Sequence, residues 1–238
     1  MIGCKDGAPP ADPVVQKPVE AKPTTPATGS GAGNAEKTTK AFGDIYAKAT
    51  WGTNEGGVGH SGTGSTDKST AVYRLVLQQF LADHKITSVV DAGCGDWEFS
   101  HLIDWTGIDY KGYDIVEKVV AQDKQRYEKP NIHFFHGNIV EDDLPPADLL
   151  ISKHVLQHLP HADVKKFLDK QLRKYKHVLL TNGVDGYTLT STNRVDIEPG
   201  GYRELDITQP PFSVPGLKLV TYWDGFHMSQ VVHIRIAQ

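Results

Sequence analysis

The sequence VVDAGCGDW occupies residues 89–97, directly after a β-branched run that begins at Ile86. Such a run followed by glycines is typical of a buried strand that ends in a tight turn. Gly93 and Gly95 allow the backbone to turn sharply and to approach a ligand closely. We also expect a helix after this turn, whose first N–H groups would face the same ligand. The stretch therefore predicts a binding site at the carboxyl end of a strand.

Strand-like and helix-like segments alternate through most of the remaining chain. Strands are expected at 86–93, 112–116, 131–137, 147–152, 176–182, 217–223 and 230–236. Helices are expected at 42–49, 66–83, 116–127 and 161–175, as well as after residue 97. The last two strands have no helix between them and so predict an antiparallel pair. The fold class is α/β: a doubly wound, mostly parallel seven-stranded sheet, Rossmann-like, with a C-terminal antiparallel hairpin.

The composition changes near residue 41. Residues 1–41 contain no aromatic residue and six of the fourteen prolines among the chain's 238 residues. Such a segment buries too little apolar surface to offset its ordering entropy, which predicts a disordered Pro/Ala/Lys-rich tail before one domain at 42–238. The net charge is −4, so no overall positive field favours nucleic acid as a partner.

The first four residues, MIGC, resemble the end of the lipobox of bacterial lipoproteins. The resemblance implies a lipid anchor at Cys4, with the tail as a lipoprotein linker and the anchor as the one contact with a membrane. The basic and apolar regions of a signal peptide do not precede Cys4 in this sequence. A cytoplasmic location is therefore favoured, with a membrane lipoprotein as the alternative.

Acidic residues surround the glycine loop and indicate its ligand. Asp114 ends the second predicted strand, 21 residues after Gly93, where a carboxylate is placed to bind ribose hydroxyls. Asp91 and Asp96 flank the glycines and suit a cofactor whose nearby end is cationic. A nicotinamide enzyme would place a third glycine at Glu98 and would hold a pyrophosphate here, which the acids disfavour.

The segment DAGCGDW resembles motif I of class I S-adenosylmethionine-dependent methyltransferases. YDIV at 113–116, FFHGNIVEDDLP and ADLLISKHVLQHLP resemble the ribose-binding, adenine-binding and post-strand-four segments of that family. The resemblance implies S-adenosylmethionine as cofactor, bound by Asp91, Gly93, Gly95, Trp97, Asp114, Asn138 and Ile139. Trp97 stands where the family has a third glycine, and we expect its side chain to meet the cofactor.

Methyl transfer needs a general base only if the acceptor carries a proton. His154 and His158 follow the fourth strand and are the catalytic candidates, because imidazole titrates near neutral pH. Trp51, Lys153 and Arg203 are the substrate-binding candidates, with Arg203 suited to an anionic acceptor. No metal site is expected, because Pro160 interrupts the histidine face and no acidic ligand follows at a fixed spacing.

These residues predict an S-adenosylmethionine-dependent methyltransferase that modifies an oxygen or nitrogen atom of an unidentified small molecule. The alternative is a non-catalytic, surface-tethered binding protein that has kept the methyltransferase fold.

Overall fold

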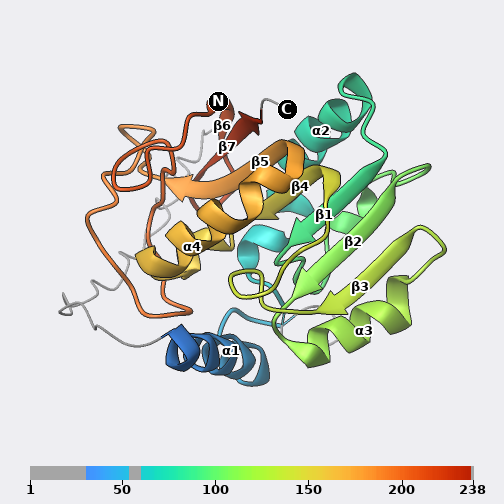
Figure 1. The fold of residues 1–238 in the computed structure, drawn as a ribbon, viewed down its shortest axis with the longest axis horizontal. Coiled ribbons are helices and arrows are strands. Elements are labelled where there is room, and N and C mark those ends of the chain that lie inside the picture. Colours follow the sequence, from blue (N-terminus) through green and yellow to red (C-terminus); the bar gives the residue numbers. More distant parts are fainter. Residues whose placement is uncertain (1–30, 54–59, 237–238) are drawn as a thin grey trace, which may run out of the picture.

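The computed structural model describes residues 31–53 and 60–236. Seven strands form one sheet in the order β3–β2–β1–β4–β5–β7–β6 (Figure 1). They are β1 (Ser88–Ala92), β2 (Asp109–Asp114), β3 (Ile132–His136), β4 (Ala147–Lys153), β5 (Tyr175–Val184), β6 (Leu217–Trp223) and β7 (Met228–Arg235). Strands β1 to β5 pair in parallel, whereas β7 is antiparallel to both β5 and β6. The predicted fold class and the C-terminal hairpin are confirmed.

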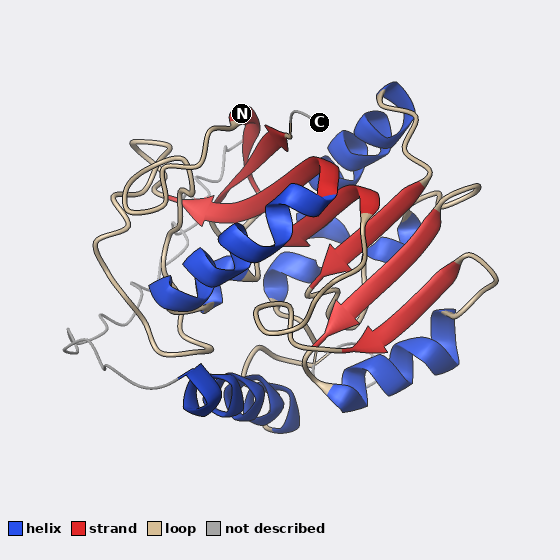
Figure 2. Cartoon of the chain, viewed as in Figure 1, coloured by secondary structure: helices blue, strands red, loops and turns tan. Residues whose placement is uncertain are grey.

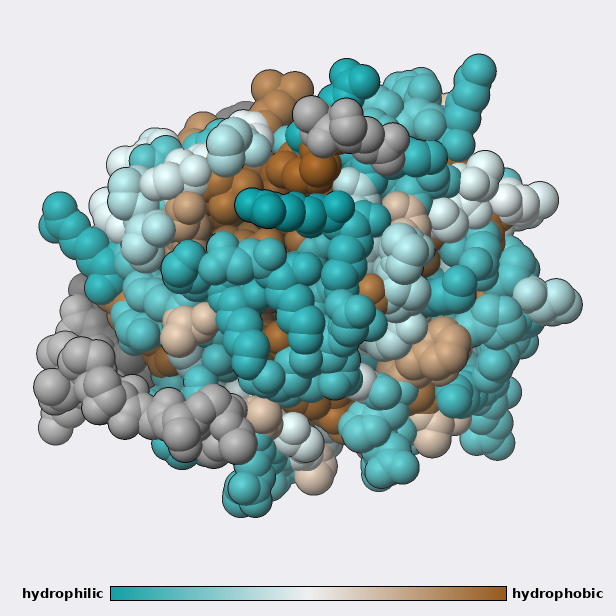
Figure 3. All heavy atoms as spheres, viewed as in Figure 1, coloured by the Kyte–Doolittle hydropathy of each residue, from teal (hydrophilic) through white to brown (hydrophobic). Residues whose placement is uncertain are grey.

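Helices cover the sheet on both faces. They are α1 (Gly31–Ala47), α2 (Asp67–Asp83), α3 (Glu117–Tyr127) and α4 (His161–Gln171). One apolar cluster packs α1 and α4 against the sheet, and a second packs α2 and the segment after β1. In Figure 2 α4 crosses in front of the strands, and in Figure 3 hydrophilic side chains cover most of this face. Among the described residues, no helix is long and apolar enough to cross a membrane.

The N-terminal helix is longer than the sequence suggested. The predicted helix was 42–49, behind a tail of 41 residues, but α1 begins at Gly31. Residues 31–41 are therefore helical and not part of a disordered tail. Asn34 donates a hydrogen bond to Asp163 on α4 (2.9 Å), and Thr38 is buried. The composition did not indicate this helix, because the residues before Phe42 that pack against the domain are small or polar and not apolar. Residues 1–30, with Cys4, lie outside the described residues.

The expected helix after the glycine loop is wrong, and only the short 3-10 turn Ser100–Leu102 forms there. Trp97 has a φ of 56°, which a continuous helix does not accommodate. This segment also buries Trp97, Phe99 and Trp105 in the core. The backbone is irregular because aromatic side chains spaced in this way cannot all face the sheet from one helix.

Candidate active site

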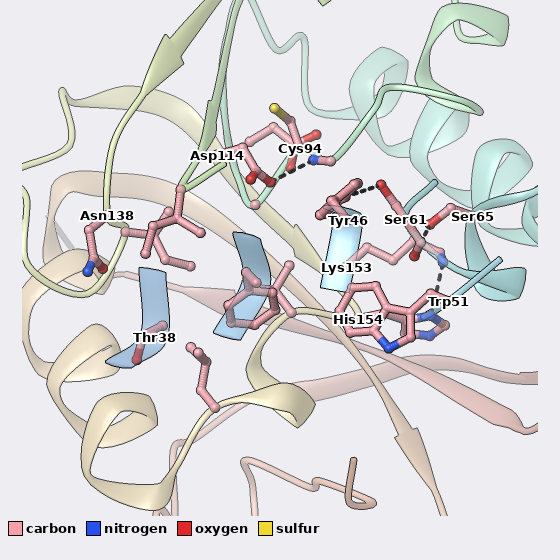
Figure 4. A pocket seen from close by; sticks show the side chains of 18 of the residues that line it. Thr38, Tyr46, Trp51, Ser61, Ser65, Cys94, Asp114, Asn138, Lys153 and His154 are labelled. Atoms are coloured by element: carbon pink, nitrogen blue, oxygen red, sulfur yellow. Dashed lines mark hydrogen bonds between the residues drawn. The ribbon is translucent and has the colours of Figure 1, made fainter. Parts of the chain in front are cut away.

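A cavity opens at the carboxyl ends of β1, β2 and β4 (Figure 4). We call it the first cavity. Its floor is the glycine loop, and its walls come from α1, the segment 60–65 and the loops after β3 and β4. Its lining residues include Thr38, Phe42, Tyr46, Trp51, Ser61, Tyr73, Asp91, Gly93, Gly95, Phe99, Asp114, Ile115, Asn138, Ile139, Lys153, His154 and Val155. Its mixed apolar and polar lining is typical of a small-molecule site.

Asp114 lies at the end of β2 and organises the floor of this cavity. Its Oδ2 accepts a hydrogen bond from the backbone N–H of Gly95 (3.0 Å), and its Oδ1 accepts one from Val116 (2.9 Å). Burial raises the pKa of the carboxyl to about 6, although these two N–H donors oppose the shift. Each carboxylate oxygen keeps a further lone pair. Asp114 is therefore equipped to accept two hydroxyl groups of a ribose.

Asp91 and Lys153 place opposite charges in the same cavity. Asp91 accepts a hydrogen bond from the hydroxyl of Tyr110 (2.7 Å), and burial raises its pKa to about 7. Burial lowers the pKa of Lys153 to about 7, and its Nζ donates to the carbonyl of Gly64 (2.7 Å). A bound ligand that carries both an ammonium and a carboxylate group, as an amino acid does, would complement these two side chains.

Hydrogen bonds hold the segment 60–65 against the glycine loop, where this segment covers one side of the first cavity. Ser61 Oγ donates to Asp96 Oδ1 (2.9 Å) and accepts from the backbone N–H of Asp96 (2.9 Å). The hydroxyl of Tyr46 on α1 lies 2.6 Å from the same Oγ. These contacts close one side of the first cavity (Figure 4). Sequence reasoning missed Tyr46 as a site residue, because it belongs to no motif near the glycines.

A second cavity adjoins the first. It is lined by Thr50, Trp51, Ser61, Gly62, Thr63, Gly64, His154, Gln157, His158, Val184, Gly186, Tyr202, Glu204, Trp223, Phe226, His227 and Met228. Trp51, Ser61 and His154 line both cavities. The two cavities therefore meet at these three side chains, and ligands in the two cavities would approach each other there.

Comparison with known families identifies the family of the chain. The family described as the O-methyltransferase domain matches residues 34–190, which include α1, the glycine loop and β4. The chain belongs to this family. The match begins inside α1, in agreement with the helix that the structure places there.

The relatives of this O-methyltransferase domain agree on its class. A probable S-adenosylmethionine-dependent methyltransferase of Mycolicibacterium smegmatis is 32% identical over 114 residues, or 47% of this chain. The aligned region spans 40% of that relative's length. The domain is a class I S-adenosylmethionine-dependent methyltransferase domain, and the comparisons support neither a nicotinamide enzyme nor a non-catalytic binding protein.

Solved structures share its fold. A 1,6-didemethyltoxoflavin-N1-methyltransferase of Burkholderia thailandensis, with that compound and S-adenosylhomocysteine bound, has a TM-score of 0.64 at 14% identity. The alignment covers 91% of this chain and 94% of that one. The magnesium protoporphyrin IX methyltransferase of Synechocystis, with S-adenosylhomocysteine bound, has a TM-score of 0.57 at 15% identity, over 85% and 97% of the two chains.

Most of the predicted cofactor residues of the methyltransferase domain line the first cavity. They are Asp91, Gly93, Gly95, Asp114, Asn138 and Ile139. The donor set fits S-adenosylmethionine, since Asp114 offers ribose acceptors and Asp91 and Lys153 match the ammonium and carboxylate of its methionine part. Of the predicted acceptor-side residues, Lys153 lines the first cavity and His158 the second, whereas Trp51 and His154 line both. Whether each of these residues has its predicted role remains a prediction.

Two predicted site residues lie elsewhere. Trp97 is 2% exposed and packs against Tyr110 and Phe134 in the core, so its expected contact with the cofactor is wrong. Arg203 is buried and donates to the carbonyl of Leu159 (2.6 Å). Arg203 lines neither cavity, and its role toward an anionic acceptor stays a prediction.

His158 makes the methyltransferase domain sensitive to acid. Burial lowers its pKa to about 4, although its hydrogen bond to the carbonyl of Gly201 (2.7 Å) opposes this shift. The unfolded chain therefore binds a proton here more readily than the folded one, and stability is lost as the pH falls from 6.5 towards 4. We expect the free energy of unfolding to fall over this range by about 2 kcal/mol more in the wild type than in His158→Gln. Urea unfolding of both proteins at pH 7 and pH 4.5 measures the difference, and equal losses would contradict the prediction.

Proposed function

We propose that this protein transfers the methyl group of S-adenosylmethionine from the first cavity to an oxygen atom of a small molecule in the second. The observation that carries the proposal is that the two cavities meet at Trp51, Ser61 and His154, which line both. Displacement at a methyl group requires the acceptor atom and the leaving sulfur to lie on opposite sides of the methyl carbon. A cofactor cavity and an acceptor cavity that adjoin at these side chains provide this arrangement.

The residues of the chain mainly position and enclose the reactants. The cofactor, when bound, supplies an electrophilic methyl group on a sulfonium. Asp114 would hold the ribose, and Asn138 and Ile139 would flank the adenine. Tyr46 and Ser61 exclude water by fixing the cover over the glycine loop.

The second cavity supports an uncharged, flat acceptor. Aromatic side chains line it from three separate segments: Trp51, Tyr202, Trp223 and Phe226. Rings of this kind supply large apolar contact areas for planar ligands. Glu204 also lines the cavity, and its carboxylate would repel an anionic ligand. A small aromatic or similarly planar hydroxyl compound is the acceptor class that these side chains favour.

Filling the second cavity tests the proposal. Gly186 lines only that cavity, and an added Cβ there would find Met228 no closer than 3.7 Å. We expect Gly186→Phe to bind S-adenosylmethionine and S-adenosylhomocysteine as the wild type does, measured by calorimetry on the full chain. Transfer of labelled methyl from S-adenosylmethionine to a small-molecule extract of the source cells should fall at least 10-fold, because the phenyl ring occupies the acceptor volume.

Gly43→Ala on α1 is a matched control, since nothing lies within 4 Å of its added Cβ. Undiminished methyl transfer by Gly186→Phe would contradict an acceptor site in the second cavity. Failure of the wild type to bind either sulfur ligand would contradict the proposed function as a whole.

A further inference from the structure

The turn between β6 and β7 brings an aspartate and a histidine to the edge of the second cavity. The side chain of Asp224 is fully buried. Its Oδ1 accepts hydrogen bonds from the backbone N–H groups of Phe226 (2.9 Å) and His227 (3.0 Å). Its Oδ2 lies 2.8 Å from Nδ1 of His227, with the imidazole tilted out of line for an ideal hydrogen bond. The turn thus fixes the carboxylate and sets it against the ring.

A chain of polar side chains connects this pair with the first cavity. Lys153 Nζ lies 3.2 Å from Nδ1 of His154, and Nε2 of His154 lies 2.8 Å from the hydroxyl of Ser229. Ser229 donates to Oδ2 of Asp224 (2.9 Å). Because Ser229 gives its one hydroxyl proton to Asp224, it accepts from Nε2 of His154, which leaves Nδ1 to accept from Lys153. Both ring nitrogens of His154 are therefore engaged.

His227 is the histidine left with a usable lone pair. The pKa of Asp224 lies at about 2, because hydrogen bonds from His227 and Phe226 outweigh the opposing effect of burial. An ionised carboxylate only accepts, which places the proton of a neutral His227 on Nδ1 and leaves Nε2 unprotonated. Gly183 has no side chain to cover that ring edge, whereas a Cβ there would lie 2.9 Å from Cδ2 of His227 and would collide with it.

The third histidine of the second cavity, His158, has no carboxylate partner. Nδ1 of His158 bonds to a backbone carbonyl and not to a carboxylate, and burial lowers its pKa to about 4. An imidazole of such low pKa is mostly unprotonated at neutral pH but has little affinity for an acceptor's proton. Asp224 instead provides a negative charge that stabilises the protonated form of His227.

We infer that His227 is the general base for the acceptor and that Asp224 is its positioning residue. The inference rests on the proposed function. The acceptor then enters as a neutral hydroxyl. Its proton passes to Nε2 of His227, its oxygen forms the bond to the methyl carbon, and the methyl–sulfur bond breaks with its electron pair kept by sulfur. The products are a methyl ether, S-adenosylhomocysteine and an imidazolium held by Asp224, and the imidazolium later releases its proton to solvent.

A metal ion is the competing interpretation of this cluster. Ligand atoms of His154, Asp224 and His227 lie within 4.8 Å of one another. However, each oxygen of Asp224 already lies near two donors, and both nitrogens of His154 are engaged. The ammonium of Lys153 beside His154 would also repel a cation. Proton transfer to His227 uses the lone pair of its Nε2 and leaves all of these contacts in place.

Histidine ¹⁵N NMR of the full chain tests the pair without any acceptor. We expect Nε2 of His227 to be unprotonated and Nδ1 to be protonated at neutral pH. In Asp224→Asn the Nδ1-protonated form of His227 should no longer be favoured, because the amide can donate as well as accept while Oδ1 still caps the turn. The titratable groups that face the pair are Lys153, His154, His158, Tyr202, Glu204 and Tyr222. Asp109→Asn is the control for loss of an exposed carboxylate.

A kinetic test separates the base from a structural role. Phenol and 4-nitrophenol are the probes, at a pH where only the nitrophenol is ionised. His227→Gln should lower transfer to phenol about 100-fold and transfer to 4-nitrophenol far less, with unchanged S-adenosylmethionine affinity. His133→Gln is the matched control on β3.

Three results would overturn the inference: a proton on Nε2 of neutral His227, an unchanged His227 tautomer in Asp224→Asn, or equal losses with both phenols. Stoichiometric binding of Zn²⁺ or Mn²⁺ that Asp224→Asn abolishes would assign the cluster to a metal instead. If the wild type binds S-adenosylmethionine but methylates neither phenol, the proposed acceptor class fails, and the NMR result alone decides the role of the pair.

Discussion

Asp114→Asn is expected to weaken S-adenosylmethionine binding about 100-fold, measured by calorimetry on the full chain. The carboxylate accepts the Gly95 and Val116 N–H groups and has lone pairs left for two hydroxyls. Hydrogen bonds to a charged group contribute about 1.5–3 kcal/mol each, and about 1.4 kcal/mol is a tenfold change in affinity. The amide keeps one acceptor oxygen but directs donors at Gly95 or Val116, so the glycine loop also loses its alignment.

Asp109→Asn provides the matched control, because Asp109 begins the same strand and its side chain is about half exposed. Its affinity for the cofactor should equal that of the wild type. Thermal unfolding of both variants separates loss of binding from loss of the fold. Unchanged affinity in Asp114→Asn would mean that the ribose does not bind at the β2 end of the first cavity.

Gly93→Ala is expected to lower the free energy of unfolding by about 3 kcal/mol and to abolish measurable cofactor binding. Gly93 has a φ of 87°, which costs an L-residue about 1–2 kcal/mol. A Cβ there would also collide with the side chain of Val155. Because Val155 is β-branched and stiff at χ1, the loop must shift to relieve the overlap. The loop is the floor of the first cavity, so its shift disturbs the cofactor.

Gly107→Ala separates these two causes. Gly107 has a similar φ of 75°, but nothing lies within 4 Å of its added Cβ. Chemical denaturation should therefore show a loss of about 1 kcal/mol and cofactor binding should remain. Equal losses in the two variants would mean that backbone strain, and not contact with Val155, makes Gly93 necessary.

The sheet could be predicted because its strands are local patterns. Runs such as SVVDA and LKLVTYW show β-branched content and turn boundaries within a few residues. The cofactor loop could be predicted for the same reason, since its glycines and the acid after them have a fixed spacing. Asp91, Gly93, Gly95 and Asp114 accordingly line one cavity.

The errors arose where long-range contacts decide the position of a side chain. On helix α2 the aliphatic residues Val72 and Leu75 are 39% and 72% exposed, whereas Tyr73 and Leu77 are buried. The aliphatic residues alone do not identify the buried face, because Tyr73 packs edge-on against Phe99 in the core. The position of Trp97 in a motif predicted a contact with the cofactor. Its indole instead packs in the core against Tyr110 of β2.

The acceptor side was the least predictable. His227 and Asp224 come from a hairpin turn with no recognisable motif, about seventy residues after His154. Their proximity to His154 depends on the antiparallel return of β7 beside β5, which brings Ser229 opposite Gly183. Spacing along the chain carries no information about such a contact until the topology is known.

The two cavities draw on different parts of the polypeptide. Among the described residues, those that line the first cavity all precede residue 160, whereas eight that line the second lie between 184 and 228. In the proposed function, the chain after residue 183 therefore contributes to the acceptor cavity and not to the cofactor cavity. An engineer could exchange the stretch after β5 to redirect the enzyme to another acceptor and leave the cofactor cavity intact. Random substitutions after residue 183 should likewise alter selectivity more readily than they abolish cofactor binding.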